Sequence, residues 1–206
     1  MATRTPDPTA LDDLGEVRDA SSSCQRCELY RGASQTVFGT GPTTAWLVLL
    51  GEQPGDREDR AGEPFDGPAG RLLDRALEDA GIERDATYVT NAVKHFKFEE
   101  RGKRRIHQKP NASEIRACRP WLDAELRLIR PSVLGLLGAT AAQALLGSSF
   151  RITKHRGEVL PCGDHLVAVP TVHPSSILRL PDEQRREAYS ALVADLKVIA
   201  DQAPTR

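Results

Sequence analysis

Residues 46–56 read Trp-Leu-Val-Leu-Leu-Gly-Glu-Gln-Pro-Gly-Asp, an apolar run that is followed directly by a polar, glycine-containing turn. Apolar side chains at consecutive positions are typical of a strand that is buried on both faces of a parallel sheet. Three later runs have the same character, at 88–93, 132–137 and 166–169. These four segments predict the strands of one buried, mostly parallel sheet.

Helical patterns lie between these strands. The stretch 68–80 has leucines at 72, 73 and 77 and ends at Gly81, a residue type that commonly terminates helices. Further helical patterns occupy 9–20, 113–129, 139–146 and 182–200. Strands that alternate with helices predict an α/β fold, a three-layer sandwich with a central four-stranded, mostly parallel sheet.

The composition is that of a globular domain. The chain has 206 residues, of which 39% are hydrophobic and 28% are charged, and its formal net charge is −1. We expect one domain over 1–206, with residues 1–8 as a flexible tail. The sequence has no apolar run of membrane-spanning length and no apolar leader, so we expect a cytoplasmic protein without a membrane partner. Without an overall basic field, a nucleic-acid site would have to be a local patch.

Polar or glycine-rich residues accompany the end of each predicted strand. They occupy 51–56 after the first strand, position 91 near the end of the second, 138–140 after the third and 173–176 after the fourth. The carboxyl ends of parallel strands meet at one edge of a sheet, where open α/β folds bind their ligands. We therefore expect a ligand site at this edge.

The side chains at this edge offer several kinds of chemistry. Glu52 and Asp56 are carboxylates beside a turn that a ligand can approach closely, and the alternative is a turn-forming or capping role. Phe65 offers either a platform for a stacked base or a plug for the core. Asn91 can donate to and accept from one planar edge, although an asparagine also caps strand ends. His173 adds an imidazole, for which we expect a functional role.

Thr140 and Ser175 each carry a hydroxyl group close to the expected ligand site. Thr140 is in the first turn of the predicted helix 139–146, and Ser175 lies two residues after His173. Free N–H groups and the helix dipole at a helix start favour an anion such as phosphate. We expect Thr140 and Ser175 to contact DNA, and the alternative for Thr140 is a plain helix cap.

The stretch 94–109 is strongly basic. It reads Lys-His-Phe-Lys-Phe-Glu-Glu-Arg-Gly-Lys-Arg-Arg-Ile-His-Gln-Lys and holds seven Lys or Arg against two Glu. We expect a long exposed loop in which Lys94, Lys103 and Arg105 contact DNA phosphates. Phe96 and Phe98 interleave with the lysines, which suits single-stranded nucleic acid because bases stack on aromatic rings. The alternative is a solvated run of charges.

The cysteines have metal-binding or redox spacing. Cys24-x-x-Cys27 is typical of a metal clamp or a redox pair, and the two further cysteines, Cys118 and Cys162, favour the clamp. Disulfides are disfavoured in a reducing cytosol. The alternative is four reduced thiols, two of them buried.

Together these residues resemble the uracil-DNA glycosylase superfamily, and within it the family 4 enzymes that carry an iron–sulfur cluster. The stretch 51–55 is similar to the family's first motif, and 173–175 is similar to its second. Gln53 and the inserted loop 103–107 are similar to the UdgX-like branch, because ordinary family 4 members lack that loop. The resemblance covers nearly the whole chain from Cys24 onward.

The resemblance implies that the substrate is uracil in DNA, preferably single-stranded. Since nothing in the sequence demands more than one copy, we expect a monomer. In this picture Phe65 stacks on the uracil and Asn91 reads its O4 and N3–H edge. His173 donates to uracil O2 and stabilises the leaving group. Asp56 holds water or part of the polar network around the base.

UdgX-like proteins are implied to stay joined to C1′ of the abasic site through a loop histidine, here His107. Glu52 would then orient the His107 ring, and Gln53, which we also expect to bind substrate, would help to hold the loop. Lys103 and Arg105 would draw the loop onto the DNA backbone. Two alternatives stay open: an ordinary multiple-turnover family 4 glycosylase, and a non-catalytic module that binds single-stranded DNA.

The resemblance also implies a [4Fe-4S] cluster. Family 4 enzymes have a Val-Lys-Cys run after the second strand, where this chain has Val-Lys-His at 93–95. The ligands implied by this alignment are Cys24, Cys27, His95 and Cys118, and the alternative fourth ligand is Cys162. Mixed cysteine and histidine ligation occurs in other iron–sulfur centres.

Overall fold

A five-stranded sheet forms the centre of the computed structural model, which describes residues 7–204. Its strands are β1 (Leu47–Gly51), β2 (Thr87–Asn91), β5 (Val133–Leu137), β6 (Leu160–Pro161) and β7 (Val167–Thr171). The order is β2-β1-β5-β7-β6; the first four are parallel, and β6 pairs antiparallel with β7. The predicted α/β fold is confirmed. The fifth strand was not predicted because two residues carry no periodic pattern.

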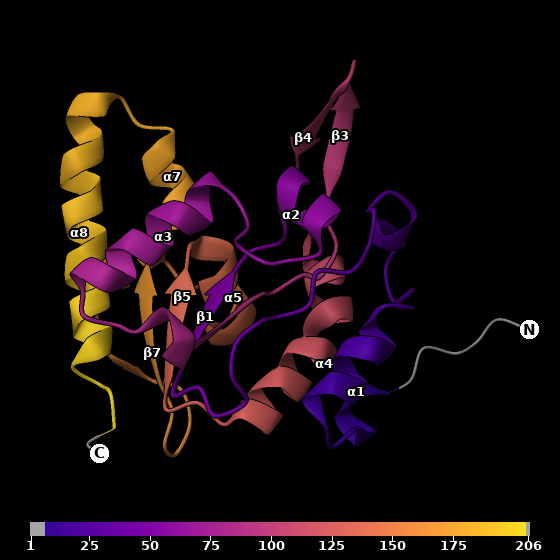
Figure 1. Cartoon of the computed structure of the whole chain (residues 1–206), viewed down its shortest axis with the longest axis horizontal. Coiled ribbons are helices and arrows are strands. Elements are labelled where there is room, and N and C mark those ends of the chain that lie inside the picture. Colours follow the sequence, from indigo (N-terminus) through magenta and orange to yellow (C-terminus); the bar gives the residue numbers. More distant parts are fainter. Residues whose placement is uncertain (1–6, 205–206) are drawn as a thin grey trace, which may run out of the picture.

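Helices cover both faces of this sheet (Figure 1). One face carries α3 (Pro68–Asp79), α7 (Pro174–Leu178) and α8 (Asp182–Ala200), and the other carries α1 (Leu14–Ser21), α4 (Ala112–Ile129) and α5 (Ala139–Leu146). The remaining elements include the short helices α2 (Asp56–Ala61) and α6 (Ile152–His155) and the 3-10 turns Pro8–Ala10, Glu28–Arg31 and Arg84–Ala86. The helices α2, α6 and α7 were not predicted, because so few residues show no helical periodicity.

Strand β1 shows why its sequence is a continuous apolar run. Leu47 and Leu49 pack in the cluster under α3 and α8, whereas Val48 and Leu50 pack in the cluster under α4 and α5. Successive side chains of a strand point to opposite faces, so a sheet covered on both faces needs apolar residues at every position. All four side chains are at most 1% exposed.

The parallel register brings the ends of the strands to one edge. Gly51 at the end of β1 is the register partner of Asn91 at the end of β2. Leu137 at the end of β5 is likewise the partner of Thr171 at the end of β7. The polar segments that follow these strands therefore lie at the same edge of the sheet.

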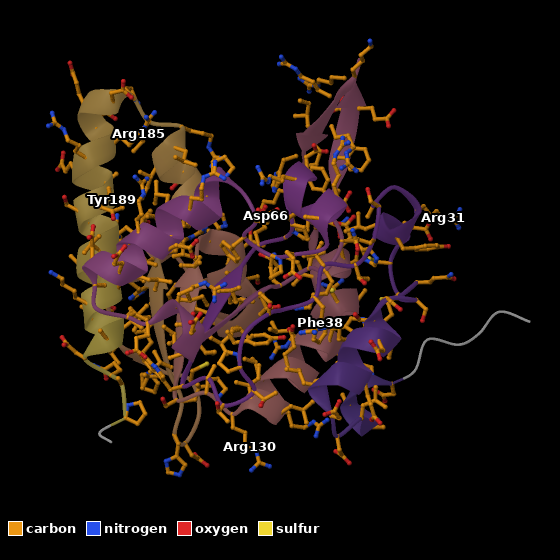
Figure 2. All side chains as sticks on the ribbon, in the orientation of Figure 1. Arg31, Phe38, Asp66, Arg130, Arg185 and Tyr189 are labelled. Atoms are coloured by element: carbon orange, nitrogen blue, oxygen red, sulfur yellow. The ribbon has the colours of Figure 1, made fainter. Side chains whose placement is uncertain are left out.

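The basic stretch forms a β-hairpin instead of the expected irregular loop. β3 (Phe98–Arg101) pairs antiparallel with β4 (Arg104–His107), and the hairpin projects beyond the body of the protein (Figure 1). Gly102 has a φ of 60° in the two-residue turn between them. Such turns favour glycine at a position with positive φ, which is why the strands can reverse here. Figure 2 shows side chains at the tip of the hairpin extending away from the protein.

The amino-terminal segment is described from Asp7 onward. The expected tail was 1–8, of which 1–6 lie outside the described residues. Pro8 is buried in the 3-10 turn, which Asp7 caps by accepting from the amide of Thr9, so the tail prediction was wrong for these two positions.

Within 7–204, no helix has the length and apolar character needed to cross a membrane.

Candidate active site

The centre of the candidate site is the contact between Gly51, Asn91 and Phe65. A Cβ atom on Gly51 would lie 2.3 Å from Asn91 Oδ1 and 2.9 Å from Phe65 Cζ, so only glycine fits between these two side chains. Phe65 has a φ of 61°, an uncommon conformation for an aromatic residue. A Cβ atom on Gly70 would lie 1.6 Å from the Phe65 carbonyl oxygen, so the backbone of α3 is packed directly against it. The surrounding structure therefore holds Phe65 in a strained geometry beside Asn91.

His173 faces the same centre. Its ring stacks on that of Phe65, with centroids 5.9 Å apart and an interplanar angle of 23°. The backbone N–H of Ser175 donates to His173 Nδ1 over 3.2 Å, and Ser175 Oγ lies 2.8 Å from the same nitrogen. A backbone amide can only donate, so the neutral ring carries its proton on Nε2. Ser175 thus orients His173, and its hydroxyl is engaged there and not directed to a phosphate as we expected.

Burial keeps His173 uncharged. Desolvation lowers its pKa to about 4, and the positive charge of Arg179 acts in the same direction, as does that of His107 when its ring is protonated. At neutral pH the side chain is therefore a neutral hydrogen-bond donor through Nε2.

Glu52 connects the sheet edge to the hairpin. His107 Nε2 lies 3.3 Å from Glu52 Oε1, and the hydroxyl of Thr140 donates to Glu52 Oε2. Thr140 is 2% exposed, so the expectation that it contacts DNA was wrong; it holds the carboxylate of Glu52 at the start of α5. Burial lowers the pKa of His107, and the charge of Glu52 opposes that shift.

Gln53 clamps the base of the hairpin. Its side-chain amide donates to the carbonyl oxygens of Lys97 (3.1 Å) and Gln108 (3.0 Å), and its Oε1 accepts from the Lys97 amide at 3.2 Å. Lys97 precedes β3 and Gln108 follows β4, so one buried side chain joins both ends of the insertion to the first motif. Gln53 was expected to bind substrate and to hold the loop, and its hydrogen bonds in this structure serve the second purpose.

Arg105 points into the protein. Its guanidinium donates to Asp59 over 2.7 Å and to Asp56, and it packs on the rings of Phe96 and Phe98 at 5.3 and 4.9 Å. The expected phosphate contact of Arg105 was therefore wrong, because its donors are used to attach β4 to α2. Asp56 was expected to hold water, but its carboxylate is paired with Arg105 and Arg60. Burial alone would raise the pKa of Asp56, and these two guanidinium groups outweigh burial and lower it.

The aromatic residues of the basic stretch do not form a platform for DNA bases. Phe96 is 2% exposed and stacks on Phe98, with ring centroids 5.1 Å apart. Lys103 at the tip of the hairpin is exposed, as its predicted DNA contact requires. The exposed basic residues of the stretch are Arg101, Lys103 and Arg104 near the turn of the hairpin and Lys109 after β4.

Lys94 is buried. Its side chain is 1% exposed, and its ammonium lies 2.5 Å from Glu125 Oε2 on α4. The prediction that Lys94 contacts DNA was wrong, because the glutamate that neutralises it lies 31 residues away in the sequence and could not be foreseen.

Three cysteines lie near one another between α1 and α4. Burial raises the pKa of Cys27 and raises that of Cys118 to about 12. The neighbouring thiols act in the same direction with a smaller effect, whereas Lys94 opposes the shift of Cys118. The indole N–H of Trp121 donates to Cys24 Sγ at 3.1 Å, and the amide of Lys94 donates to Cys118 Sγ at 3.2 Å. N–H groups aimed at sulfur are a common surrounding of iron–sulfur ligands.

Cysteine thiolates with N–H donors directed at them are a donor set that suits an iron–sulfur cluster. No group of three or more side chains in the described part of the chain is arranged to hold one metal ion. The thiolates of a [4Fe-4S] cluster each bind a different iron, so their sulfurs surround the cluster and do not converge on a point. His95 follows Lys94 directly, is 4% exposed, and has a pKa that burial lowers to about 4. The charged neighbour of His95 is Asp59 and that of Cys162 is Arg119, and no thiol contributes to the pKa shift of either residue.

Sequence reasoning missed three acidic residues that build the site. Asp59 accepts from Arg105 and from the amide of Ser34, and Glu125 neutralises Lys94. Glu58 accepts from the backbone N–H groups of Gly55 and Phe65. A glutamate three residues after a potential helix cap is a known signal, so Glu58 could have been found.

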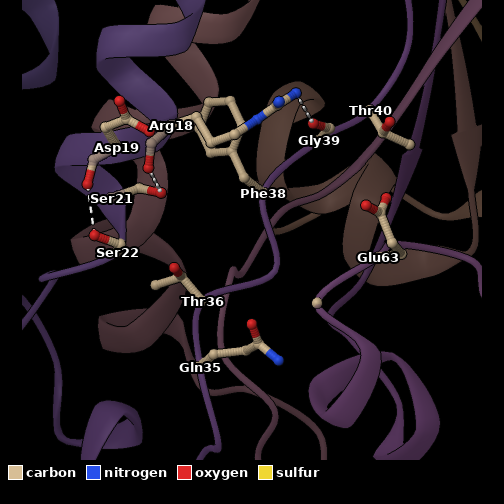
Figure 3. Close-up of a pocket in the computed structure, with 11 residues that line it drawn as sticks. Arg18, Asp19, Ser21, Ser22, Gln35, Thr36, Phe38, Gly39, Thr40 and Glu63 are labelled. Atoms are coloured by element: carbon tan, nitrogen blue, oxygen red, sulfur yellow. Dashed lines mark hydrogen bonds between the residues drawn. The ribbon is translucent and has the colours of Figure 1, made fainter.

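A cavity of about 280 Å³ lies away from this edge (Figure 3). Its wall includes Arg18 of α1, Gln35, Phe38 and Glu63. None of the predicted site residues lines it. The candidate active site is therefore defined by the strand ends and not by this cavity.

Comparison with known proteins agrees with the fold and these motifs. The sequence profile of the Uracil DNA glycosylase superfamily matches residues 38–197. The chain belongs to this superfamily.

Several relatives carry a more specific name. A type-4 uracil-DNA glycosylase of Sulfurisphaera tokodaii is 32% identical over 203 residues, covering 95% of this chain and 87% of the relative. The type-4 uracil-DNA glycosylase of Archaeoglobus fulgidus is 33% identical, with 93% and 92% covered. That of Thermotoga maritima is 35% identical, with 79% and 82% covered.

Proposed function

We propose that this chain is a uracil-DNA glycosylase of the type-4 kind that acts in DNA repair and cleaves the bond between uracil and deoxyribose. The observation that carries the proposal is the convergence of Asn91, Phe65 and a neutral His173 at one sheet edge. Membership of the superfamily and the names of the relatives support the same activity.

Each of the three side chains has a distinct part in the reaction. The base must leave the helical stack or be met in a single strand, and Phe65 then stacks on it. The carboxamide of Asn91 accepts from N3–H and donates to O4, a pattern that cytosine inverts. Since a mismatched base would leave buried polar groups unpaired, this contact discriminates strongly.

His173 supports departure of the base. When the C1′–N1 bond breaks, its electron pair leaves with uracil, and the negative charge spreads onto O2. Because Nδ1 of His173 accepts from Ser175, the proton of the neutral ring is on Nε2, and this Nε2–H can donate to that oxygen. One positioned donor of this kind contributes about 3–4 kcal/mol to transition-state stabilisation.

The finer proposal is that His107 traps the sugar, as in the UdgX-like branch. The C1′–N1 bond breaks and uracil departs with the electron pair, and a neutral ring nitrogen of His107 then uses its lone pair to form a bond to C1′ of the oxocarbenium-like sugar. The alkylated ring loses its remaining N–H proton to Glu52 or solvent, so the bond to C1′ is retained. What supports this step is the 3.3 Å approach of His107 to Glu52 and a side chain that is 49% exposed. In the alternative, an ordinary turnover glycosylase, water attacks C1′ in place of His107, and the roles proposed for the other residues are the same.

The proposed cofactor is a [4Fe-4S] cluster held by Cys24, Cys27, Cys118 and His95, with Cys162 as the alternative fourth ligand. When bound, such a cluster would join the segment before β1 to α4 and to the start of the basic stretch. The amide of Lys94 and the indole of Trp121 would donate to its cysteine sulfurs. Its role in this proposal is structural.

An oligonucleotide assay tests the glycosylase proposal. The protein is incubated with labelled single-stranded and duplex DNA that carries one uracil, one thymine or one cytosine, and abasic sites are revealed with alkali or as protein adducts. We expect loss of uracil alone, with faster reaction on the single strand. Equal binding to all three DNAs without loss of uracil would leave the non-catalytic module as the better account.

A further inference from the structure

Behind the candidate site lies a buried ion pair that the reaction described above does not use. The ammonium of Lys94 donates to Glu125 Oε2 and to Thr90 Oγ1, both at 2.5 Å, and to the main-chain oxygen of Asn91 at 3.0 Å. These three acceptors match the three N–H groups of a lysine. The lysine is therefore completely paired inside the protein.

The carboxylate of Glu125 is equally well paired. It accepts from the amide of Gly39 at 3.1 Å, the hydroxyl of Tyr88 at 3.0 Å and the hydroxyl of Thr90 at 2.9 Å, besides Lys94. Both charged groups are at most 1% exposed. The network thus links α4 to β2.

The ring of Phe38 closes this network on one side. It lies 5.5 Å from the ammonium of Lys94 and also forms part of the cavity wall, where Arg18 packs on it (Figure 3). Phe38 lies within the body of the protein, where Figure 2 labels it. The ion pair is therefore separated from solvent by an aromatic ring.

Stability does not explain such an arrangement. Removing two charges from water is costly, and a buried pair is often replaced by apolar residues with no loss of stability. A fully paired buried network does, however, fix the groups that it contacts in one geometry. The relevant question is which functional group this network fixes.

The network contacts the backbone of Asn91, whose side chain faces Phe65. Beyond Asn91, the amide of Ala92 donates to the Gly51 oxygen and the amide of Val93 donates to the Glu52 oxygen, both at 3.0 Å. The segment from 91 to 94 is thus held to the first motif by two amides and to the core by the ammonium of Lys94. Loss of the ammonium would leave the carbonyl of Asn91 without this partner, so that its peptide would be held only through the amide of Ala92.

We propose that Lys94, held by Glu125, is a positioning residue that sets the carboxamide of Asn91 for recognition of the uracil edge. The proposal rests on the proposed function, because it assigns to Asn91 the reading of the base. In this way Glu125 and Lys94 connect α4, which carries Cys118, to the residue that reads the base.

A double-mutant cycle tests this assignment. The paired variant Lys94→Met/Glu125→Gln removes the ammonium without leaving an unpaired carboxylate, and it is combined with Asn91→Ala. Single-turnover uracil release separates the rate constant from the amplitude, which reports the fraction of active protein. Iron content and thermal unfolding are measured in parallel, and the exposed Lys154→Met serves as the matched control.

We expect the paired variant to lower the rate constant by about 10- to 100-fold, as small misplacements of a binding group do. In the Asn91→Ala background the same substitutions should change it by less than about twofold, because coupled residues are not additive. An equal loss in both backgrounds, or a loss of amplitude alone, would overturn the proposal.

A crystal structure of the paired variant gives a second test that does not depend on activity. We expect the Asn91 carboxamide to be displaced from its position beside Gly51, and an unchanged carboxamide would overturn the proposal. If the wild-type protein released no uracil, the proposed function would fail, whereas this structural result would still decide whether Lys94 positions Asn91.

Discussion

The sheet edge and the β3–β4 hairpin are held in the protein in different ways. At the edge, Asn91 is the last residue of β2 and His173 follows β7, and both strands have apolar side chains buried in the core, which fixes the backbone. The hairpin that carries His107 has mostly exposed or half-buried residues and is attached through the polar contacts of Gln53 and Arg105. In our proposal, base recognition and sugar trapping therefore belong to separate parts of the structure, and mutations should separate them.

The largest effect should come from the edge, because both uracil release and trapping depend on it. His173→Ala removes the donor to the leaving base, and we expect both rates to fall by about 10²–10³-fold. Single-turnover measurements on uracil DNA check this, with the exposed His165→Ala as control. A variant that kept either rate would show that the two regions do not share His173.

Loosening the hairpin should affect trapping alone. Gln53→Ala removes the three hydrogen bonds that join both ends of the insertion to the first motif, so His107 would lose its alignment. We expect adduct formation to fall by about 10- to 100-fold, with uracil release changed by less than about threefold. The exposed Gln184→Ala is the matched control, and an equal fall in both reactions would contradict the separation.

The link between the two regions can be weakened at Thr140. Thr140→Val keeps the shape of the side chain but removes the hydroxyl that donates to Glu52. A hydrogen bond to a charged group is worth about 1.5–3 kcal/mol, so we expect adduct formation to slow by about tenfold. Thr140→Ser should retain most of the rate, and a normal rate in the valine variant would exclude this role.

The pH dependence should differ between the regions. Burial lowers the pKa of His107 below 6.5, so the ring is neutral at higher pH and becomes protonated, and unable to attack, as the pH falls through that lower pKa. His173 has a pKa of about 4 and stays neutral over a wider range. We expect adduct formation to be constant from pH 8 to about 6.5 and to decline further down, by up to about tenfold per unit. Uracil release, followed separately, should decline only nearer pH 4.

The strands could be predicted from the sequence, whereas the hairpin contacts could not. The four apolar runs correspond to β1, β2, β5 and β7 because a doubly covered sheet leaves a continuous local signal. The edge site followed from the same signal, since polar residues after parallel strands must come together. Lys94 and Arg105 were assigned to DNA from a local excess of charge, but their partners Glu125 and Asp59 lie 31 and 46 residues away.

The other wrong prediction concerns the conformation of the basic stretch 94–109, which we expected to be an exposed loop. A run of charges carries no apolar alternation, so β3 and β4 left no periodic signal, and only Gly102 marked their turn. Burial of Phe96 also depends on the ring of Phe98 and the guanidinium of Arg105, which meet only when the hairpin forms. Tertiary pairing, not local preference, decided this part of the site.

The most direct measurement of the separation uses uracil-containing single-stranded DNA and a denaturing gel. Wild-type protein and His107→Ser are each mixed with the labelled strand, boiled in detergent and examined for a shifted band and for alkali-labile sites. We predict a shifted band with the wild type only, and alkali-labile abasic sites with His107→Ser. A shifted band with His107→Ser, or turnover without any band from the wild type, would contradict the assignment of trapping to the hairpin.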